Sequence, residues 1–488
     1  MRIPRSAVPL GFAAAAFVAV LWITRPPGPG LDPDAMSYLG AAESFAEHGT
    51  LRIPVGTWDS PDGTEPLGHF PPGFSLALAA PIKLGADPIQ AARALEAVSA
   101  AAAAGVVVWL ASLAGGALGA VLTGAVLFVT PAFALDHLRV LSEPLFLALL
   151  VLTLAAMVRA PDRPLLHGVL AAVAGAVRYA GASLAGAAAL WALARPGTAR
   201  ARVTRAVLAL APGALVQVAW TLRTRAEEGK VRSFGLKGDV GATLREGWET
   251  LTAWLAPGID HTLIRSVVAV VVAGAVAWLV WRARRRERAL FLATGIGAAC
   301  YAGLVLFSRL FADSQIPLDE RMLSPFFLFA SLAAAVAAAL AWQGAGRAAR
   351  WAGAAALAVW LVASAWRTDL WIRDARNGGW GYAGDEWLAS DLVRWLRTDG
   401  TRYRLYTDNP AGVWFATGRR SWKLPEAVDE DTVRLFGAAL RRWHGAVIGF
   451  SNPFEPLASP PELAARLGLV ELARFGSAAT VWAPRDGP

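Results

Sequence analysis

The sequence predicts a mainly α-helical polytopic membrane protein with about eleven transmembrane helices, followed by a small α/β domain. Of its 488 residues, 56% are hydrophobic and only 17% are charged, whereas a soluble domain usually has about 25% charged residues. Apolar runs near the roughly 20 residues needed to cross the hydrocarbon recur along most of the chain, and the mean hydropathy is +0.44. After Thr368 the pattern changes to alternating helix and strand signals.

The first apolar run, 7–23, resembles a signal peptide because a short basic region precedes it. It lacks a convincing small-x-small cleavage site and many spans follow, so we interpret it as an uncleaved first transmembrane helix. The short pair at 165–177 and 180–194 is the weakest in length. All candidate spans lie at residues 7–23, 94–113, 117–134, 141–158, 165–177, 180–194, 204–222, 264–282, 288–307, 322–342 and 350–367.

Arginine-rich loops set the expected orientation, because loops rich in Lys and Arg stay cytoplasmic. Alternate loops carry these residues: Arg2 and Arg5, Arg159 and Arg163, Arg195 to Arg205, Arg282 to Arg288, and Arg347 and Arg350. The first loop and everything after Thr368 then lie outside the cytoplasm. The segment 223–263 should be external too, although it contains several basic residues.

The first external loop begins with a predicted surface helix over 33–48. Asp32 and Pro33 are typical of an N-cap and first helical position, and Gly49 is a plausible stop. Spacings of three and four residues put one set of side chains on one face of this helix, namely Asp34, Tyr38, Ala41 and Phe45. Asp34 is either a favourable charge for the helix dipole or a functional carboxylate.

A second amphipathic run follows in HFPPGFSLALAAPIKLG, residues 69–85. Pro71, Pro72 and Gly73 break the chain just before it, which by itself indicates only a turn. The run has about a dozen residues and is too short to cross a bilayer. We therefore expect two surface helices within one large external loop.

Three charged stretches lie at the predicted external ends of later spans. Glu143 opens a membrane helix in SEPLF, Arg178 and Tyr179 separate two short spans, and Arg321 precedes the tenth span in DERMLSP. Each has a structural alternative: a helix-start charge for Glu143, snorkelling for Arg178, and local pairing with Asp319 or Glu320 for Arg321.

The C-terminal region, 369–488, mixes an amphipathic helix with strand-like segments and a hairpin turned at Gly476 and Ser477. We expect a transmembrane domain over 1–368 and an extracytoplasmic α/β domain over 369–488. The strand-like segments are RYRLYTD, GAVIGF and LVELARFGSAATVWAP.

The net charge and the cysteine content limit the partners and cofactors that we expect. The net charge of +9 is concentrated in loops beside spans, so nucleic acid is not an expected partner. Cys300 is the single cysteine, which excludes an intramolecular disulfide, and no zinc-ligand spacing or phosphate-cradling glycine loop is present.

The order of these motifs resembles the GT-C membrane glycosyltransferases, specifically bacterial members akin to glycosyltransferase family 39. That superfamily includes protein O-mannosyltransferases and the aminoarabinose transferases of lipid A. The likeness covers roughly residues 1–345. It rests on D-x-x-x-Y after the first span, the PPG-led helix, SEPLF, R-Y between short spans, and D-x-R-x-L-x-P.

The resemblance implies an inverting transfer of a sugar from a polyprenyl-phosphate donor to a lipid, glycan or protein acceptor, outside the cytoplasm at the inner (plasma) membrane. Asp34 occupies the position of the family's catalytic aspartate, and Glu143 that of its second acidic residue. For the donor phosphate we expect Arg178 and Arg321, whose guanidinium forks match phosphate oxygens. The remaining candidates are His69 for the phosphate, and Tyr38 and Tyr179 for the substrate.

No cofactor is certain, and a divalent metal ion bridging Asp34 and Glu143 is left open, since the family members differ in this respect. One departure concerns the donor pocket. Family members often have a basic residue directly before the double proline, where this chain has Phe70, with His69 one position earlier.

Two other classes of function are weighed. A transporter or flippase should have paired polar residues near the bilayer midplane and inverted repeats, whereas the charges here gather at one face and no repeat is evident. A different membrane transferase, such as an O-antigen ligase or acyltransferase, and a non-catalytic scaffold are the remaining alternatives.

Overall fold

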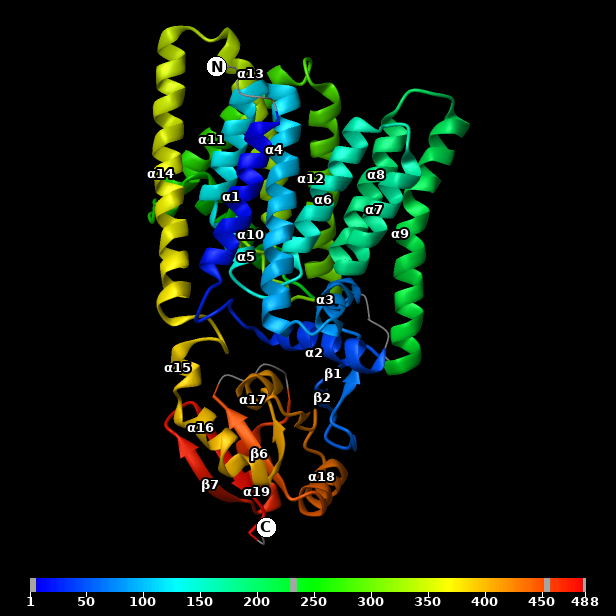
Figure 1. The fold of residues 1–488 in the computed structure, drawn as a ribbon, viewed down its shortest axis with the longest axis vertical. Helices are drawn as coiled ribbons and strands as arrows, with labels where there is room; N and C mark the ends of the chain where they lie inside the picture. The colour runs from blue at the N-terminus through cyan, green and yellow to red at the C-terminus, as the bar shows by residue number, and fades with distance from the viewer. Residues whose placement is uncertain (1–5, 229–234, 452–456, 486–488) are drawn as a thin grey trace. The chain divides into compact units, whose positions relative to one another are not determined.

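A computed structural model describes residues 6–228, 235–451 and 457–485 of the chain (Figure 1). The Cα positions divide into two compact units. The helical unit comprises Met1–Ile23, Phe70–Phe74 and Arg93–Asp374. The α/β unit comprises Thr24–His69, Ser75–Ala92 and Ala375–Pro488. Most of the first external loop thus belongs to the same unit as the C-terminal region. The expected domains, 1–368 and 369–488, had assigned this loop to the transmembrane domain.

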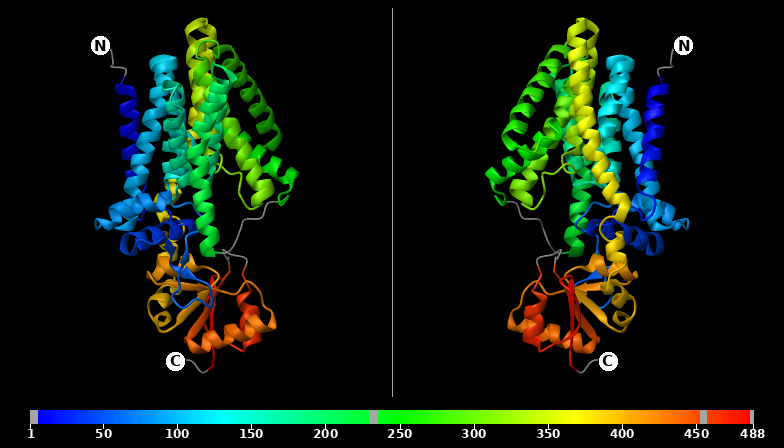
Figure 2. Two further views of the ribbon diagram at one scale, coloured as in Figure 1. Left: turned by 90° about the vertical axis from the view of Figure 1, so that its right-hand side faces the viewer. Right: turned by 90° about the vertical axis from the view of Figure 1, so that its left-hand side faces the viewer.

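Within the helical unit, long helices run side by side (Figures 1 and 2). Those with most of their residues in this unit are α1 (Ala7–Ile23), α4 (Pro88–Val129), α5 (Pro131–His137), α6 (Glu143–Arg159), α7 (Pro164–Val177), η1 (Tyr179–Gly181), α8 (Ala182–Ala194), α9 (Ala199–Glu228), α10 (Val240–Leu255), α11 (Thr262–Ala283), α12 (Arg288–Phe307), η2 (Ser308–Ala312), α13 (Ser324–Gly344) and α14 (Arg347–Gly378).

Six helices among the described residues are long and apolar enough to cross a bilayer: α4, α9, α11, α12 continued through η2, α13 and α14. Helices α1, α7 and α8 are apolar but shorter. The mainly helical membrane fold is therefore confirmed, while the count of eleven spans stays a prediction.

Helix α4 contains a chain reversal at Gly116, whose φ of 65° and ψ of −161° are not helical. A Cβ added to Gly119 would lie 2.9 Å from the carbonyl oxygen of Ala111. In a straight helix residues eight apart are about 12 Å apart, so the two arms of α4 must lie against each other. The expected spans 94–113 and 117–134 correspond to these arms, except that the second ends at Val129 and α5 begins at Pro131.

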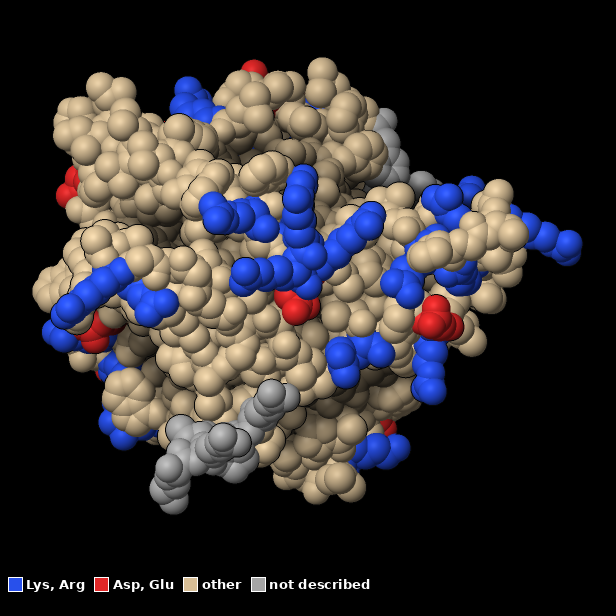
Figure 3. Space-filling view, turned by 90° about the horizontal axis from the view of Figure 1, so that it is seen from above, with Lys and Arg blue, Asp and Glu red and all other residues tan. Residues whose placement is uncertain are grey.

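The arginine-rich loops gather at one end of the helical unit, as the orientation argument requires. Figure 3 looks onto this end, where Lys and Arg side chains predominate over acidic ones. Exposed arginines there come from the loop after α6, the start of α9, the loop after α11 and the start of α14, among them Arg163, Arg200, Arg285 and Arg347. Arg2 and Arg5, with which the orientation argument begins, lie outside the described residues, as do Lys230 and Arg232 of the 223–263 segment.

The α/β unit is built on a six-stranded sheet in the order β2-β5-β4-β6-β8-β7. Strands β2, β5, β4 and β6 are parallel, and β8 and β7 add an antiparallel edge. The elements of this unit are α2 (Pro33–His48), β1 (Arg52–Ile53), β2 (Val55–Gly56), β3 (Glu65–Pro66), α3 (Gly73–Lys83), α15 (Asp385–Leu388), α16 (Asp391–Arg397), η3 (Asp399–Arg402), β4 (Arg404–Thr407), α17 (Pro410–Thr417), β5 (Ser421–Lys423), α18 (Glu430–Arg442), β6 (Gly445–Phe450), α19 (Pro460–Leu467), β7 (Val470–Phe475) and β8 (Ala479–Ala483). Helix α3 begins in the helical unit and continues in this one.

Helices cover both faces of this sheet because side chains alternate along its strands. In β4, Leu405 packs with residues of α16 and α17, whereas the next residue, Tyr406, packs with residues of α18 and α19. The predicted hairpin is present, with Gly476 at a φ of 55° between β7 and β8.

The first external loop is an integral part of this unit. Its strand β2 extends the C-terminal sheet by pairing with β5, and the Leu31 backbone bridges to Gly381. Helix α2 begins and ends as predicted: Asp32 is at the N-cap position without a side-chain capping bond, and Gly49 is left-handed at a φ of 71°. The C-terminal sheet therefore fixes the helix that carries Asp34.

Candidate active site

A buried carboxylate between two arginines is the main charged feature described in the helical unit. Glu143 is the first residue of α6, and its side chain is 4% exposed. Its Oε2 lies 2.5 Å from Nη1 of Arg178, and its Oε1 lies 3.6 Å from Nε of Arg321. Residues 143, 178 and 321, chosen from the sequence as separate motifs, are therefore brought together by the fold.

The break between α7 and α8 places Arg178. α7 ends at Val177, and Arg178 is extended, with φ −145° and ψ 142°, before η1 begins at Tyr179. Arg178 Nη1 also donates a hydrogen bond to Ser142 Oγ at 3.1 Å. The guanidinium is held in an ion pair within the protein, so snorkelling to the interface does not explain this residue.

A hydrogen-bonded turn before α13 places Arg321. The Asp319 carboxylate accepts a bond from the Met322 amide at 2.8 Å, and the buried Tyr301 hydroxyl donates to the Met322 carbonyl at 2.6 Å. Glu320 pairs with Arg367 on α14 at 2.8 Å. Both acidic neighbours thus have other partners, while the Arg321 guanidinium reaches Glu143.

Gly73 of the PPG motif brings its backbone into close contact with the end of α7, just before Arg178. A Cβ on Gly73 would lie 2.6 Å from the Ala176 carbonyl oxygen and 2.9 Å from the Val177 nitrogen. Only glycine allows this contact, which lies two residues before Arg178. The motif therefore does more than turn the chain, a role that the local sequence did not reveal.

Two further charges lie near this cluster. Arg139 acts electrostatically on Glu143, and Asp136 lies within the field of Glu143, Arg178 and Arg321. Three guanidinium groups thus act on Glu143, and two of them, those of Arg178 and Arg321, also act on Asp136. Such a cluster suits an anion with several acceptor oxygens, and above all a phosphate.

The other predicted residues, Asp34, Tyr38 and His69, belong to the α/β unit. Asp34, in the first turn of α2, is half-buried, and Tyr38 is buried at 2% exposure. His69 is exposed.

A metal-binding role for Glu143 stays a prediction, and the charges around this residue oppose it. Both its oxygens already face guanidinium groups, which repel a divalent cation. Among the described residues, no group of three or more His, Cys, Asp or Glu side chains is placed to hold a metal ion.

Tyr179 is linked to the start of the 223–263 region, to which the sequence assigned no motif. Its hydroxyl accepts a hydrogen bond from Trp220 Nε1 at 3.1 Å, and the Arg223 guanidinium lies 4.5 Å from the Trp220 ring centroid. Neither Trp220 nor Arg223 was predicted, because no short motif marks them.

The fold of the chain is similar to that of solved GT-C membrane glycosyltransferases, as the sequence resemblance predicted. In particular, the chain is similar over 97% of its length, and 97% of theirs, to two crystal structures of the aminoarabinose transferase ArnT from Cupriavidus metallidurans. One contains undecaprenyl phosphate (TM-score 0.59, 14% identity), and the other is the apo state (0.60, 15%).

A weaker likeness links the chain to the Archaeoglobus fulgidus oligosaccharyltransferase tethered to an acceptor peptide. The TM-score is 0.49 at 12% identity, over 91% of this chain and 69% of that one. The sequence matches no protein-family model, and no curated protein sequence matches it.

Proposed function

We propose that this protein is a membrane glycosyltransferase that moves a sugar from a polyprenyl-phosphate donor to a hydroxyl or amine of an envelope lipid, glycan or protein. The observation that carries the proposal is the buried Glu143 held between Arg178 and Arg321, in a chain with the GT-C fold. The undecaprenyl phosphate in the ArnT structure supports this class of donor.

Arg178 and Arg321 bind the donor phosphate in this proposal. Hydrogen bonds from a guanidinium to a phosphate are charge-assisted and about twice as strong as neutral ones. As the sugar leaves, negative charge grows on the phosphate, and preorganised cations then contribute most. Glu143 keeps the two guanidinium groups oriented between turnovers, because its carboxylate is their fixed counter-charge.

Asp34 acts as the general base. An acceptor hydroxyl must lose its proton as it attacks the anomeric carbon, and a positioned base is worth roughly 10²–10⁴-fold in rate. Direct attack opposite the departing phosphate inverts the anomeric centre. The protein works from the non-cytoplasmic side of the inner membrane, where the positive-inside rule places the first loop and the C-terminal region.

Binding of undecaprenyl phosphate to the purified full-length protein tests the phosphate site. Arg178→Gln and Arg321→Gln should each weaken binding at least 10-fold, because each removes a charge-assisted contact. Arg285→Gln, in the exposed loop between α11 and α12, is the matched control and should bind normally. Equal binding by all four proteins would contradict the assignment.

Asp34→Asn separates chemistry from binding. This variant should bind undecaprenyl phosphate as the wild type does and should lose sugar transfer in cells. Normal transfer would remove Asp34 as the base but would leave the phosphate site intact.

A further inference from the structure

Asp136 is a buried carboxylate whose two oxygens have no well-aligned hydrogen-bond donor among the described residues. It lies near the end of α5 and is 0% exposed. The Ser324 hydroxyl is near enough to act as a weak donor to it, but among the described residues no donor, Ser324 included, meets full hydrogen-bond geometry at either Oδ atom.

This state is energetically unfavourable unless something else supplies the donors. A buried polar atom without a partner costs about 1–3 kcal/mol, and a charged group costs more. Buried groups that native proteins leave unsatisfied are few, and a functional role is one of their main explanations. The second carboxylate of the cluster differs in its charges: Glu143 has two guanidinium groups at ion-pair distance, although its oxygens also lack a partner with full hydrogen-bond geometry.

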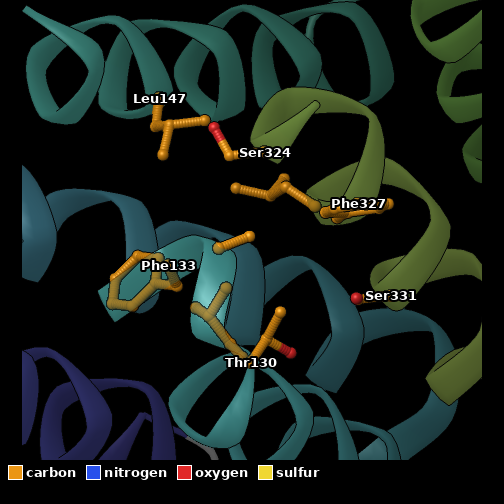
Figure 4. Close-up of a pocket in the computed structure, with 9 residues that line it drawn as sticks. Thr130, Phe133, Leu147, Ser324, Phe327 and Ser331 are labelled. Atoms are coloured by element: carbon orange, nitrogen blue, oxygen red, sulfur yellow. The ribbon is translucent and has the colours of Figure 1, made fainter. Parts of the chain in front are cut away.

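The small cavity lined in part by Ser324 is too narrow for a sugar. It lies between α4, α5, α6 and α13, with the hydroxyls of Thr130, Ser324 and Ser331 on its wall (Figure 4). Its volume holds about one water molecule. Asp136 is not among the residues that line this cavity, so a ligand in the arginine cluster is the more direct source of donors for it.

We propose that Asp136 is a specificity residue that accepts hydrogen bonds from hydroxyl groups of the donor sugar, next to the phosphate held by Arg178 and Arg321. The inference rests on the proposed function. A polyprenyl chain carries no donors and an ionised phosphate carries none, so the hydroxyls of the attached sugar are the nearest donors that such a ligand brings. A carboxylate has two acceptor oxygens and matches two neighbouring hydroxyls.

The test compares lipids with and without a sugar. Detergent extracts of the source cells, containing polyprenyl phosphate and polyprenyl-phosphate monosaccharides, are passed over immobilised full-length protein, and the retained lipids are quantified by mass spectrometry. The wild type should enrich one sugar-bearing lipid over bare polyprenyl phosphate by about 10- to 100-fold, the range for hydrogen bonds to a charged group. Asp136→Leu should lose this enrichment and bind bare undecaprenyl phosphate within about 3-fold of the wild type.

Thermal unfolding separates a binding role from a structural one. Removing an unpartnered buried carboxyl should leave the Tm of the ligand-free Asp136→Leu protein unchanged or raise it. Glu96→Gln is the control, because Glu96 is equally buried but receives a hydrogen bond from the Leu141 amide; it should keep the enrichment.

Two results of the lipid comparison would overturn the inference: Asp136→Leu keeps the enrichment of the sugar-bearing lipid, or the wild type shows no enrichment. A third would be that Asp136→Leu both loses binding of bare undecaprenyl phosphate and has a lowered Tm. The last would indicate that a water molecule or Ser324 satisfies Asp136 as part of the fold. Failure of the proposed function is a separate outcome, namely unchanged binding of bare undecaprenyl phosphate by Arg321→Gln.

Discussion

Replacing Glu143 by glutamine removes the counter-charge of the arginine cluster while keeping nearly the same shape. At an effective dielectric constant of about 20, unit charges at the observed 2.5 and 3.6 Å separations attract by about 7 and about 5 kcal/mol. Desolvation of the buried groups offsets much of this gross attraction. Removing one member of a buried ion pair typically costs about 3–5 kcal/mol, because the remaining charge is left uncompensated.

We therefore expect Glu143→Gln to unfold at a Tm several degrees lower in detergent, and to lose at least 10-fold in sugar transfer because the guanidinium groups are less well oriented. Undecaprenyl phosphate should raise the Tm of the variant by more than it raises that of the wild type, since the phosphate supplies the missing negative charge. The assay is thermal unfolding with and without this lipid, and Glu96→Gln is the matched buried control.

The two measurements together decide the role of Glu143. If Glu143→Gln had the Tm of the wild type and the same response to the lipid, the carboxylate would not be balancing the arginines. If the lipid response were enhanced but transfer stayed normal, Glu143 would stabilise the cluster without orienting it for catalysis.

Three further predictions concern single groups. Tyr301→Phe removes the hydrogen bond to the Met322 carbonyl and should lower stability by about 1 kcal/mol and undecaprenyl phosphate affinity several-fold, as measured by thermal unfolding and lipid binding. Gly73→Ala places a methyl group against the Ala176 carbonyl and should cost about 1–3 kcal/mol and reduce transfer, whereas an unchanged Tm would refute the close contact. Burial raises the pKa of Asp408 to about 6, so the folded α/β unit favours the neutral acid, and this group's stabilising effect is present below the unfolded pKa of about 4 and is lost by about pH 6; Asp408→Asn should flatten the fall in Tm between about pH 4 and 6, and an identical pH profile would contradict the shift.

Much of the local structure was predictable because short-range rules govern it. The bounds of α2 follow from Pro33 at the helix start and glycine at position 49, whose left-handed φ of 71° ends the helix. The β7–β8 hairpin follows from alternation around Gly476. The three residues that meet in the arginine cluster were also singled out from the sequence, since a charged group at a span end is conspicuous in an apolar sequence.

The rest depended on contacts between residues far apart in the sequence. Two residues of the first loop, Val55 and Gly56, extend a sheet whose other strands begin at Arg404, and a two-residue strand leaves no periodic signal. The surroundings of Asp136 could not be anticipated either, because the sequence does not show which polar groups other helices bring. Arg321 had two acidic neighbours as plausible partners, and only the fold shows that its guanidinium reaches Glu143.

The lipid composition of cells with and without this protein tests the central claim most directly. If the protein consumes a polyprenyl-phosphate sugar, cells lacking it should accumulate one such lipid, identified by mass spectrometry, and should lose the matching sugar from one envelope component. Cells carrying Asp34→Asn should show the same two changes. Unaltered levels of every polyprenyl-phosphate sugar and an intact envelope glycan profile would contradict the account.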